Sequence, residues 1–308
     1  MGIRGPSRLT AVLGVIAVAG GASVLSSASA GDERDAARTV LGKAKGLTYV
    51  VGQKTISNND PALVLDCPQR TAVTGGGTFI DTESANAYID NSAPQPAGDP
   101  SVEPDEGWYS KGTLGLGKDS RTMLTYAICS DDPKELVYRS KVKLVDTASQ
   151  STVKTRCPRG TAIAGGGVFT DSPLGYMIVF ASRPAIPGDG LGSRGGWVAT
   201  AHNEDNSKKH SLRSYAICSK EQNKYSLKTD GIPIPTVPPH NASLVVDCPG
   251  NRVVSVGGAE VRGTDNRWMP VSSPQPAGDP NQTPKEGWIA EGHSNENRTL
   301  SVYAICKK

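Results

Sequence analysis

The stretch CPQRTAVTGGG, Cys67–Gly77, decides the fold because the chain repeats it. CPRGTAIAGGG stands at Cys157–Gly167 and a looser copy, CPGNRVVSVGG, at Cys248–Gly258, so the copies begin 90 and 91 residues apart. The tetrapeptide YAIC closes each copy, ending at Cys129, Cys218 and Cys306. Self-similarity at a fixed period indicates a repeat architecture. The chain therefore contains three copies of one unit.

Shared landmarks between these ends set the boundaries of the repeats. Each copy holds a Ser-x-Pro, a Gly-Asp and a Gly-Trp in that order. The serines are Ser92, Ser182 and Ser272, the aspartates Asp99, Asp189 and Asp279, and the tryptophans Trp108, Trp197 and Trp288. We predict repeat 1 at residues 47–132, repeat 2 at 136–220 and repeat 3 at 222–308.

A proline-rich segment joins the Ser-x-Pro to the Gly-Trp. It reads PQPAGDP at Pro94–Pro100 and at Pro274–Pro280, and PAIPGDG at Pro184–Gly190. Proline fixes φ and restricts the residue before it, and Gly-Asp favours a turn. The copies share the stiff start and the turn, but not the middle side chains. We interpret the segment as a connector that delivers the tryptophan to its strand, with partner contact along its exposed edge as the alternative.

Alternating hydrophobicity predicts strands throughout the repeats. Leu63, Leu65 and Cys67 occupy alternate positions, and the interleaved positions of the copies include Asp66 and Lys154. A similar pattern precedes each YAIC, which is typical of a strand with one buried face. Further strands are expected at Thr71–Ile80, at Tyr88–Ala93, from Trp108 onward and in the lead-in Tyr138–Asp146, with counterparts in the other repeats. The sequence therefore predicts an all-β fold of three tandem antiparallel sandwich-like or barrel-like repeats. Separate beads and one pseudo-threefold body both fit, and the short polar linker 130–135 favours the first.

The six cysteines predict three disulfides, because an even count in exported sequence indicates oxidised pairs. The simplest pairing gives each repeat one bond: Cys67–Cys129, Cys157–Cys218 and Cys248–Cys306. A bond that closes such a long loop stabilises the fold by about 4 kcal/mol in the chain-entropy model. Pairing between repeats is the alternative.

The N-terminus predicts export. Arg4 and Arg8 precede an apolar run, and Ala28-Ser29-Ala30 matches a cleavage site, so residues 1–30 are expected to be a signal peptide. Residues 31–46 are charged and are predicted to be a flexible leader. The expected location is secreted or extracellular, with no membrane span after signal removal. Without the two signal arginines the net charge falls from +3 to +1, which argues against a nucleic-acid partner.

The repeat resembles a β module of secreted actinobacterial proteins, on the motifs CPRGTAIAGGG, Ser-x-Pro, Gly-Gly-Trp and YAIC. This resemblance covers nearly the whole chain after residue 46 and implies no catalytic residues. A looser similarity, to vitelline membrane outer layer protein, rests on three Cys-Pro starts in a secreted β protein. It implies fold alone.

Aromatic residues are the candidate ligand contacts. Trp108, Trp197 and Trp288 could stack on sugars, although a tryptophan kept in every copy is more often a core residue. Trp268 and Tyr88 share a position four before the Ser of the Ser-x-Pro, where repeat 2 has Ile178. We expect this site to be apolar and partly exposed at most. The triple glycine is predicted to be a bulged strand against which a backbone or the Trp ring lies, rather than an anion nest.

The four histidines suggest no catalytic or metal motif. His202 and His293 each lie five residues after their Trp, whereas His210 and His240 stand alone. No HExxH pattern and no spare Cys exist, so we expect no metal and no cofactor. A serine nucleophile elbow is also missing from the repeats, and any enzyme site should be sought around His202 and His293.

These features predict a secreted, non-enzymatic β-repeat protein that binds an extracellular ligand. Three similar units suggest multivalent binding to a repeated polymer such as a glycan or the cell wall. The partner could equally be another secreted protein. The alternatives are a secreted protease inhibitor that presents its proline-rich loop, or a structural coat protein, with a hydrolase third.

Overall fold

The fold is all-β, as the alternating pattern predicts. The computed structural model describes residues 38–57, 62–81, 87–95, 105–115, 120–173, 175–191, 195–263, 267–275, 277–278, 282–283 and 285–308. The predicted signal peptide and the first part of the predicted leader lie outside the described residues. No helix in the described parts of the chain is long and apolar enough to cross a membrane.

Each repeat contributes six strands to the fold, and repeat 1 is preceded by one more. The first group is β1 (Arg38–Ala44), β2 (Leu47–Ile56), β3 (Leu63–Asp66), β4 (Ala72–Ile80), β5 (Ala87–Gln95), β6 (Gly107–Leu114) and β7 (Arg121–Ser130). Repeat 2 holds β8 (Leu136–Val145), β9 (Ser149–Arg156), β10 (Ala162–Thr170), β11 (Met177–Pro184), β12 (Gly196–Asn203) and β13 (His210–Ser219). Repeat 3 holds β14 (Tyr225–Ile234), β15 (Asn241–Asp247), β16 (Val253–Arg262), β17 (Arg267–Gln275), β18 (Gly287–Ser294) and β19 (Arg298–Lys307). Short 3-10 helices, η1 (Pro133–Glu135) and η3 (Gln222–Lys224), precede β8 and β14.

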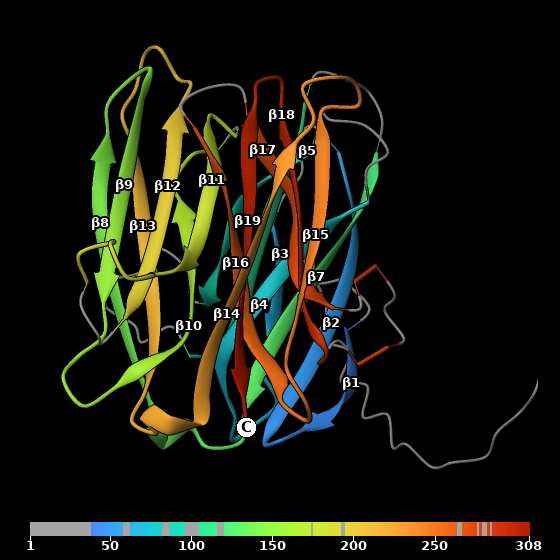
Figure 1. Ribbon diagram of the computed structural model, residues 1–308, viewed down its shortest axis with the longest axis vertical. Coiled ribbons are helices and arrows are strands. Elements are labelled where there is room, and N and C mark those ends of the chain that lie inside the picture. Colours follow the sequence, from blue (N-terminus) through green and yellow to red (C-terminus); the bar gives the residue numbers. More distant parts are fainter. Residues whose placement is uncertain are drawn as a thin grey trace, which may run out of the picture. The chain divides into compact units, whose positions relative to one another are not determined.

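Every sheet combines strands from two repeats (Figure 1). The three orders are β1-β2-β7-β4-β17-β18-β15, β3-β6-β5-β10-β13-β8 and β14-β19-β16-β11-β12-β9. The repeats meet where β5 pairs with β10, β11 with β16, and β17 with β4. All described residues belong to one compact unit. Of the two arrangements that the sequence left open, the structure has the single pseudo-threefold body, because no repeat holds a complete sheet of its own.

The disulfides pair within repeats, as predicted: Cys67–Cys129, Cys157–Cys218 and Cys248–Cys306. In each repeat the first cysteine follows a strand of one sheet and the second lies in a strand of another sheet. Each bond therefore staples two sheets together.

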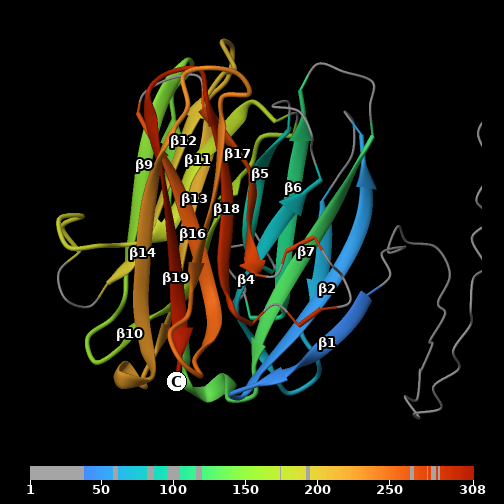
Figure 2. The same ribbon diagram turned by 45° about the vertical axis from the view of Figure 1, so that its right-hand side comes forward.

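The prediction of a flexible leader is corrected for its second half. Arg38–Ala44 forms β1, which pairs antiparallel with β2 (Figure 2). The segment forms a strand because it pairs with the outer edge of β2, from Leu47 to Gly52. An unpaired strand edge is a row of open backbone donors and acceptors, and this segment closes it. Residues 31–37 lie outside the described residues.

The glycine strand of each repeat is bulged and lies against the tryptophan of the same repeat, as predicted; repeat 3 has Val256-Gly257-Gly258 where the others have three glycines. The register of β10 shifts between Ile163 and Gly165. A Cβ placed on Gly166 would lie 2.4 Å from the Trp197 ring and 2.4 Å from the Tyr215 carbonyl oxygen. Gly76 and Gly257 meet the rings of Trp108 and Trp288 in the same way. The middle glycine is therefore required for close packing rather than for anion binding.

Gly166→Ala is expected to lower the free energy of unfolding by about 3 kcal/mol, because neither the ring nor the backbone carbonyl can yield without strain. Gly231→Ala on β14 is the matched control, since the nearest atom to an added Cβ there lies at 3.4 Å. Chemical denaturation of both variants measures the difference. Equal stability of the two variants would contradict this account of the motif.

Buried tyrosines join the repeats. The Tyr49 hydroxyl of repeat 1 donates to the Val254 carbonyl of repeat 3 at 2.7 Å, and Tyr138 of repeat 2 donates to the Val73 carbonyl of repeat 1 at 2.7 Å. Both acceptors sit at the bulge of a glycine strand. Burial raises the pKa of Tyr49 far above its ordinary value, so this donor stays protonated.

Candidate functional site

The repeated tryptophans are core residues, which corrects their candidacy as ligand contacts. Trp108, Trp197 and Trp288 are each 1% exposed. A ligand cannot stack on these rings without opening the core. The prediction that a tryptophan kept in every copy fills the interior is confirmed.

A serine partner explains why the Ser-x-Pro accompanies the Gly-Trp. The indole Nε1 atoms of Trp108, Trp197 and Trp288 donate to the Oγ atoms of Ser92, Ser182 and Ser272 at 3.0, 3.0 and 3.1 Å. The three indoles and three serines, with the middle glycines and four apolar side chains, line a cavity of about 10 Å³. A space of this size holds one water at most, so this centre is no pocket for a ligand.

Hydrogen bonds to Asp189 fix the conformation of the connector of repeat 2. Gly188 adopts φ +102°, and the Asp189 carboxylate accepts from the Ile186 backbone N–H at 2.8 Å, as predicted for a Gly-Asp turn. Arg183 donates to both oxygens of this carboxylate, at 2.7 and 3.1 Å. Burial alone would raise the pKa of Asp189, but the hydrogen bonds from Arg183 and Ile186 lower it. The equivalents Asp99 and Asp279 lie outside the described residues.

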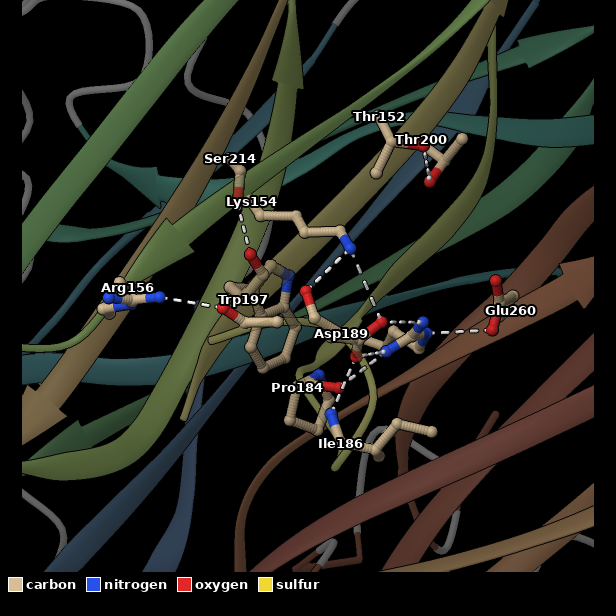
Figure 3. Close-up of polar contacts among 12 residues, drawn as sticks. Thr152, Lys154, Arg156, Pro184, Ile186, Asp189, Trp197, Thr200, Ser214 and Glu260 are labelled. Carbon is tan, nitrogen blue, oxygen red and sulfur yellow. Dashed lines mark hydrogen bonds and ion pairs between the residues drawn. The ribbon is translucent and has the colours of Figure 1, made fainter. Parts of the chain in front are cut away.

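This network continues into repeat 3 (Figure 3). Arg183 Nε donates to Glu260 of β16 at 2.9 Å, and Lys154 Nζ of β9 donates to the Asp189 backbone oxygen at 2.8 Å. Repeats 1 and 3 have Ala93 and Ser273 where repeat 2 has Arg183. The charges pair with one another, so the network holds the connector of repeat 2 against the neighbouring repeat.

The repeats differ from one another at a cross-strand pair near the end of each Ser-x-Pro/Gly-Trp hairpin. The pairs are Tyr88 with Thr113, Ile178 with His202, and Trp268 with His293. The first member of each pair is the position that holds Tyr, Ile or Trp. The second lies five residues after the repeated Trp, where repeat 1 has Thr113 in place of His. We call the three pairs the hairpin-end positions. Their side chains are half-buried, apart from buried His293.

In repeat 1 the hairpin end lies over a buried carboxyl group. Asp90 is 0% exposed and occupies the bulge position that Phe180 and Pro270 hold in the other repeats. Thr113 Oγ1 donates to Asp90 Oδ2 at 2.5 Å, and Lys111 Nζ lies 3.8 Å from the same oxygen. Burial raises the pKa of Asp90 to about 7, against the smaller opposing effects of Thr113 and Lys111.

The same end of repeat 1 is fastened to repeat 2. Lys111 Nζ donates to the carbonyls of Ser172 and Pro173 at 2.8 and 3.0 Å, and the Tyr88 hydroxyl donates to the Gly175 carbonyl at 2.8 Å. The candidate contact Tyr88 is therefore half-buried, and its hydroxyl is already bonded to the next repeat.

Repeat 3 gathers three aromatic nitrogen heterocycles at its hairpin end. The rings of Trp268 and His293 stack with centroids 4.1 Å apart, and His240 meets His293 edge-on at 6.0 Å. Trp268 Nε1, His293 Nδ1 and His240 Nδ1 are buried without a hydrogen-bond partner. Burial and the nearby His240 lower the pKa of His293 to about 4, so this ring is neutral at physiological pH.

His240 reaches this cluster because its loop folds back on β18. The Ser294 N–H donates to the His240 carbonyl at 3.0 Å, and the next residue, Asn241, pairs with His293. His240 has φ +58°, a left-handed conformation that is uncommon outside glycine but that histidine adopts more readily than most side chains. The sequence showed His240 as isolated, because only the pairing of β15 with β18 brings it to His293.

No group of three or more His, Cys, Asp or Glu side chains among the described residues is placed to hold a metal ion. His202 and His293 lie on separate hairpins. Unpartnered buried polar groups in a native fold call for an explanation such as an unseen water or ligand. The Trp268–His293–His240 cluster is therefore the strongest candidate site.

Comparisons with known proteins assign no family to the chain, so a proposal for its function depends on the geometry of the structure. No model of a known protein family matches the chain, and no curated protein matches it either. The resemblances to the actinobacterial module and to vitelline membrane outer layer protein thus stay predictions.

Proposed function

We propose that the protein is an exported, non-enzymatic binding protein that holds a hydroxylated ligand, such as a cell-wall glycan, at the Trp268–His293–His240 cluster. The observation that carries the proposal is the half-buried indole of Trp268, which stacks on His293 and, unlike the other three indoles, is not enclosed in the core. Sugars offer an apolar ring face for stacking and hydroxyls for hydrogen bonds, and such sites combine apolar surface with a few polar groups.

The cluster also changes the expected number of sites. Its equivalents are Tyr88 with Thr113 in repeat 1 and Ile178 with His202 in repeat 2, which lack the stacked indole and imidazole. The proposal is therefore one site per chain rather than three equal ones. Three disulfides and a closed core support a protein that keeps its shape outside the cell. The tethered connector of repeat 2 does not favour a protease inhibitor.

Trp268→Ala is expected to reduce retention on insoluble cell-wall polysaccharide by about tenfold or more, which corresponds to one lost stacking contact of about 1.4 kcal/mol. Ile178→Ala at the equivalent position of repeat 2 is the matched control and should leave retention unchanged. Because Trp268 is the one half-buried indole among four, bound glycan should also change its fluorescence.

Retention that is equal in the wild type, Trp268→Ala and Ile178→Ala would place binding elsewhere. No retention on any cell-wall or glycan preparation, with the fluorescence unchanged, would reject a glycan as the ligand.

A further inference from the structure

Strand β8 presents an unpaired edge. It is the last strand of its sheet, and its other edge has no strand partner among the described residues (Figure 1). The six residues from Arg139 to Leu144 are exposed on both faces of the strand. Edge strands of this kind are templates for pairing with another chain unless they are blocked.

In repeat 1 the equivalent edge is covered by an additional strand. β2 and β8 are equivalent, since Leu47 pairs with Ser130 and Leu136 pairs with Ser219 at the starts of the two ladders. β1 adds antiparallel to β2 and covers Val50, Val51 and Gly52, all of which are buried. The equivalent residues of β8 are Arg139, Ser140 and Lys141, and all three are exposed.

Repeat 3 has the same position, but its edge is blocked. β14 pairs with β19 in the same register, starting at Tyr225. It has Gly231 and Pro233 where β8 has Val142 and Leu144. Proline cannot donate to a ladder and glycine weakens a strand. β8 contains neither residue, so among the three equivalent strands β2, β8 and β14 it is the one whose outer edge is neither covered by a strand nor interrupted by proline.

The side chains of β8 indicate the chemistry of the added strand. Arg139, Lys141 and Lys143 alternate along one face. No described residue lies within ion-pair distance of any of them, although Asp146 and Lys143 attract each other electrostatically. On the other face, Val142 and Leu144 are 49% and 63% exposed. Lysines alone protect an edge from aggregation, but a purely protective edge would not expose two large apolar side chains.

We propose that the open edge of β8 binds an extended segment of a partner protein that carries acidic residues on one face and apolar residues on the other. The segment adds a strand, as β1 does in repeat 1, with carboxylates beside the three cations and apolar side chains beside Val142 and Leu144. A second copy of this chain fits less well, because antiparallel β8–β8 pairing would set like charges opposite each other.

A synthetic nine-residue peptide of alternating Glu and Val is the probe. We expect saturable binding to the intact protein by fluorescence anisotropy, weakening as salt is raised. The double variant Lys141→Glu/Lys143→Glu should bind this peptide at least about tenfold more weakly, and should now bind the corresponding Lys-Val peptide. Lys228→Glu on the blocked edge of β14 is the matched control and should bind like the wild type.

A Glu-Val peptide with alternate backbone nitrogens methylated separates strand addition from charge attraction, because it keeps its carboxylates and loses its ladder donors. Loss of binding by this peptide supports strand addition, and unchanged binding overturns it. Absence of binding by the unmodified peptide also overturns the proposal. Sedimentation that shows a dimer, dispersed by Lys141→Glu/Lys143→Glu, would make a second copy the occupant and reject the acidic partner.

Discussion

Replacing Asp90 by asparagine is expected to stabilise the protein at pH 8 and to change its stability little near pH 4. Asp90 is buried at the bulge of β5, where the other repeats place Phe180 and Pro270. Burial raises the pKa of this carboxyl from 3.8 to about 7, although Thr113 and Lys111 partly oppose the shift. Asparagine has the shape of the protonated acid and carries no charge to bury.

The sign follows from proton uptake. Between pH 4 and pH 7 the native Asp90 keeps a proton that the unfolded chain has released, so the free energy of unfolding falls as the pH rises through this window. A shift of about three pH units corresponds to about 4 kcal/mol at most. Above pH 7 the penalty is complete, and D90N removes it. In the variant Lys111 loses its ion pair with Asp90 but keeps its two carbonyl acceptors, which limits the destabilisation.

The stability of the wild type alone does not isolate the effect of Asp90, because His293 also makes the free energy of unfolding depend on pH. The difference in free energy of unfolding between D90N and the wild type must therefore be measured. Because burial lowers the pKa of His293 to about 4, the unfolded chain takes up a proton near pH 6.5 that the native ring refuses. This contribution to stability is lost as the pH falls from about 6.5 to about 4, which is the direction opposite to that of Asp90. The two partly cancel in the wild type, but His293 drops out when the wild type is subtracted from D90N.

The experiment is urea denaturation of the wild type and D90N at intervals from pH 4 to pH 8. The gap between them should open as the pH rises and level off above pH 7. Asp247→Asn, at an exposed position of β15, is the control and should give a flat difference. A gap that is constant with pH, or one in which the wild type gains on D90N as the pH rises, would show that the Lys111 ion pair outweighs burial.

Features that recur in all three repeats could be predicted from the sequence, and contacts between different repeats could not. The pairing of Cys157 with Cys218 and the burial of Trp197 follow from residues that every copy keeps. The bond from Arg183 to Glu260 occurs once, between residues 77 positions apart. Nothing in the spacing of either residue indicates that β11 pairs with a strand of the next repeat.

The candidate site was predicted in part. Trp268 and His293 were candidates from the sequence, but His240 stood alone, because it belongs to a loop that no other copy shares. Asp90 did carry a signal, since the aligned residues Phe180 and Pro270 are apolar. A lone charge at a position that is otherwise apolar indicates a buried ionisable group. The strand Arg38–Ala44 could not be predicted for two reasons. Its charged flank is typical of a mobile segment, and nothing in the sequence indicates that the edge of β2 is free to pair with it.

Removing one disulfide is expected to destabilise all three repeats together. Cys157 and Cys218 staple two sheets, and each of those sheets also contains strands of a second repeat. Cys157→Ala/Cys218→Ala should therefore lower the free energy of unfolding by about 4 kcal/mol, mainly through the larger entropy of the unfolded chain, in one transition for the whole body. Independent repeats would instead give a separate early transition for repeat 2.

Hydrogen exchange resolves the two outcomes strand by strand. In the shared-sheet fold, the double variant should exchange faster in β5 and β16, which belong to repeats 1 and 3 and pair with β10 and β11, as well as within repeat 2. The matching pairs Cys67→Ala/Cys129→Ala and Cys248→Ala/Cys306→Ala should behave alike, since their loops are of similar length. Faster exchange confined to the strands of repeat 2 would mean that the repeats unfold independently despite their common sheets.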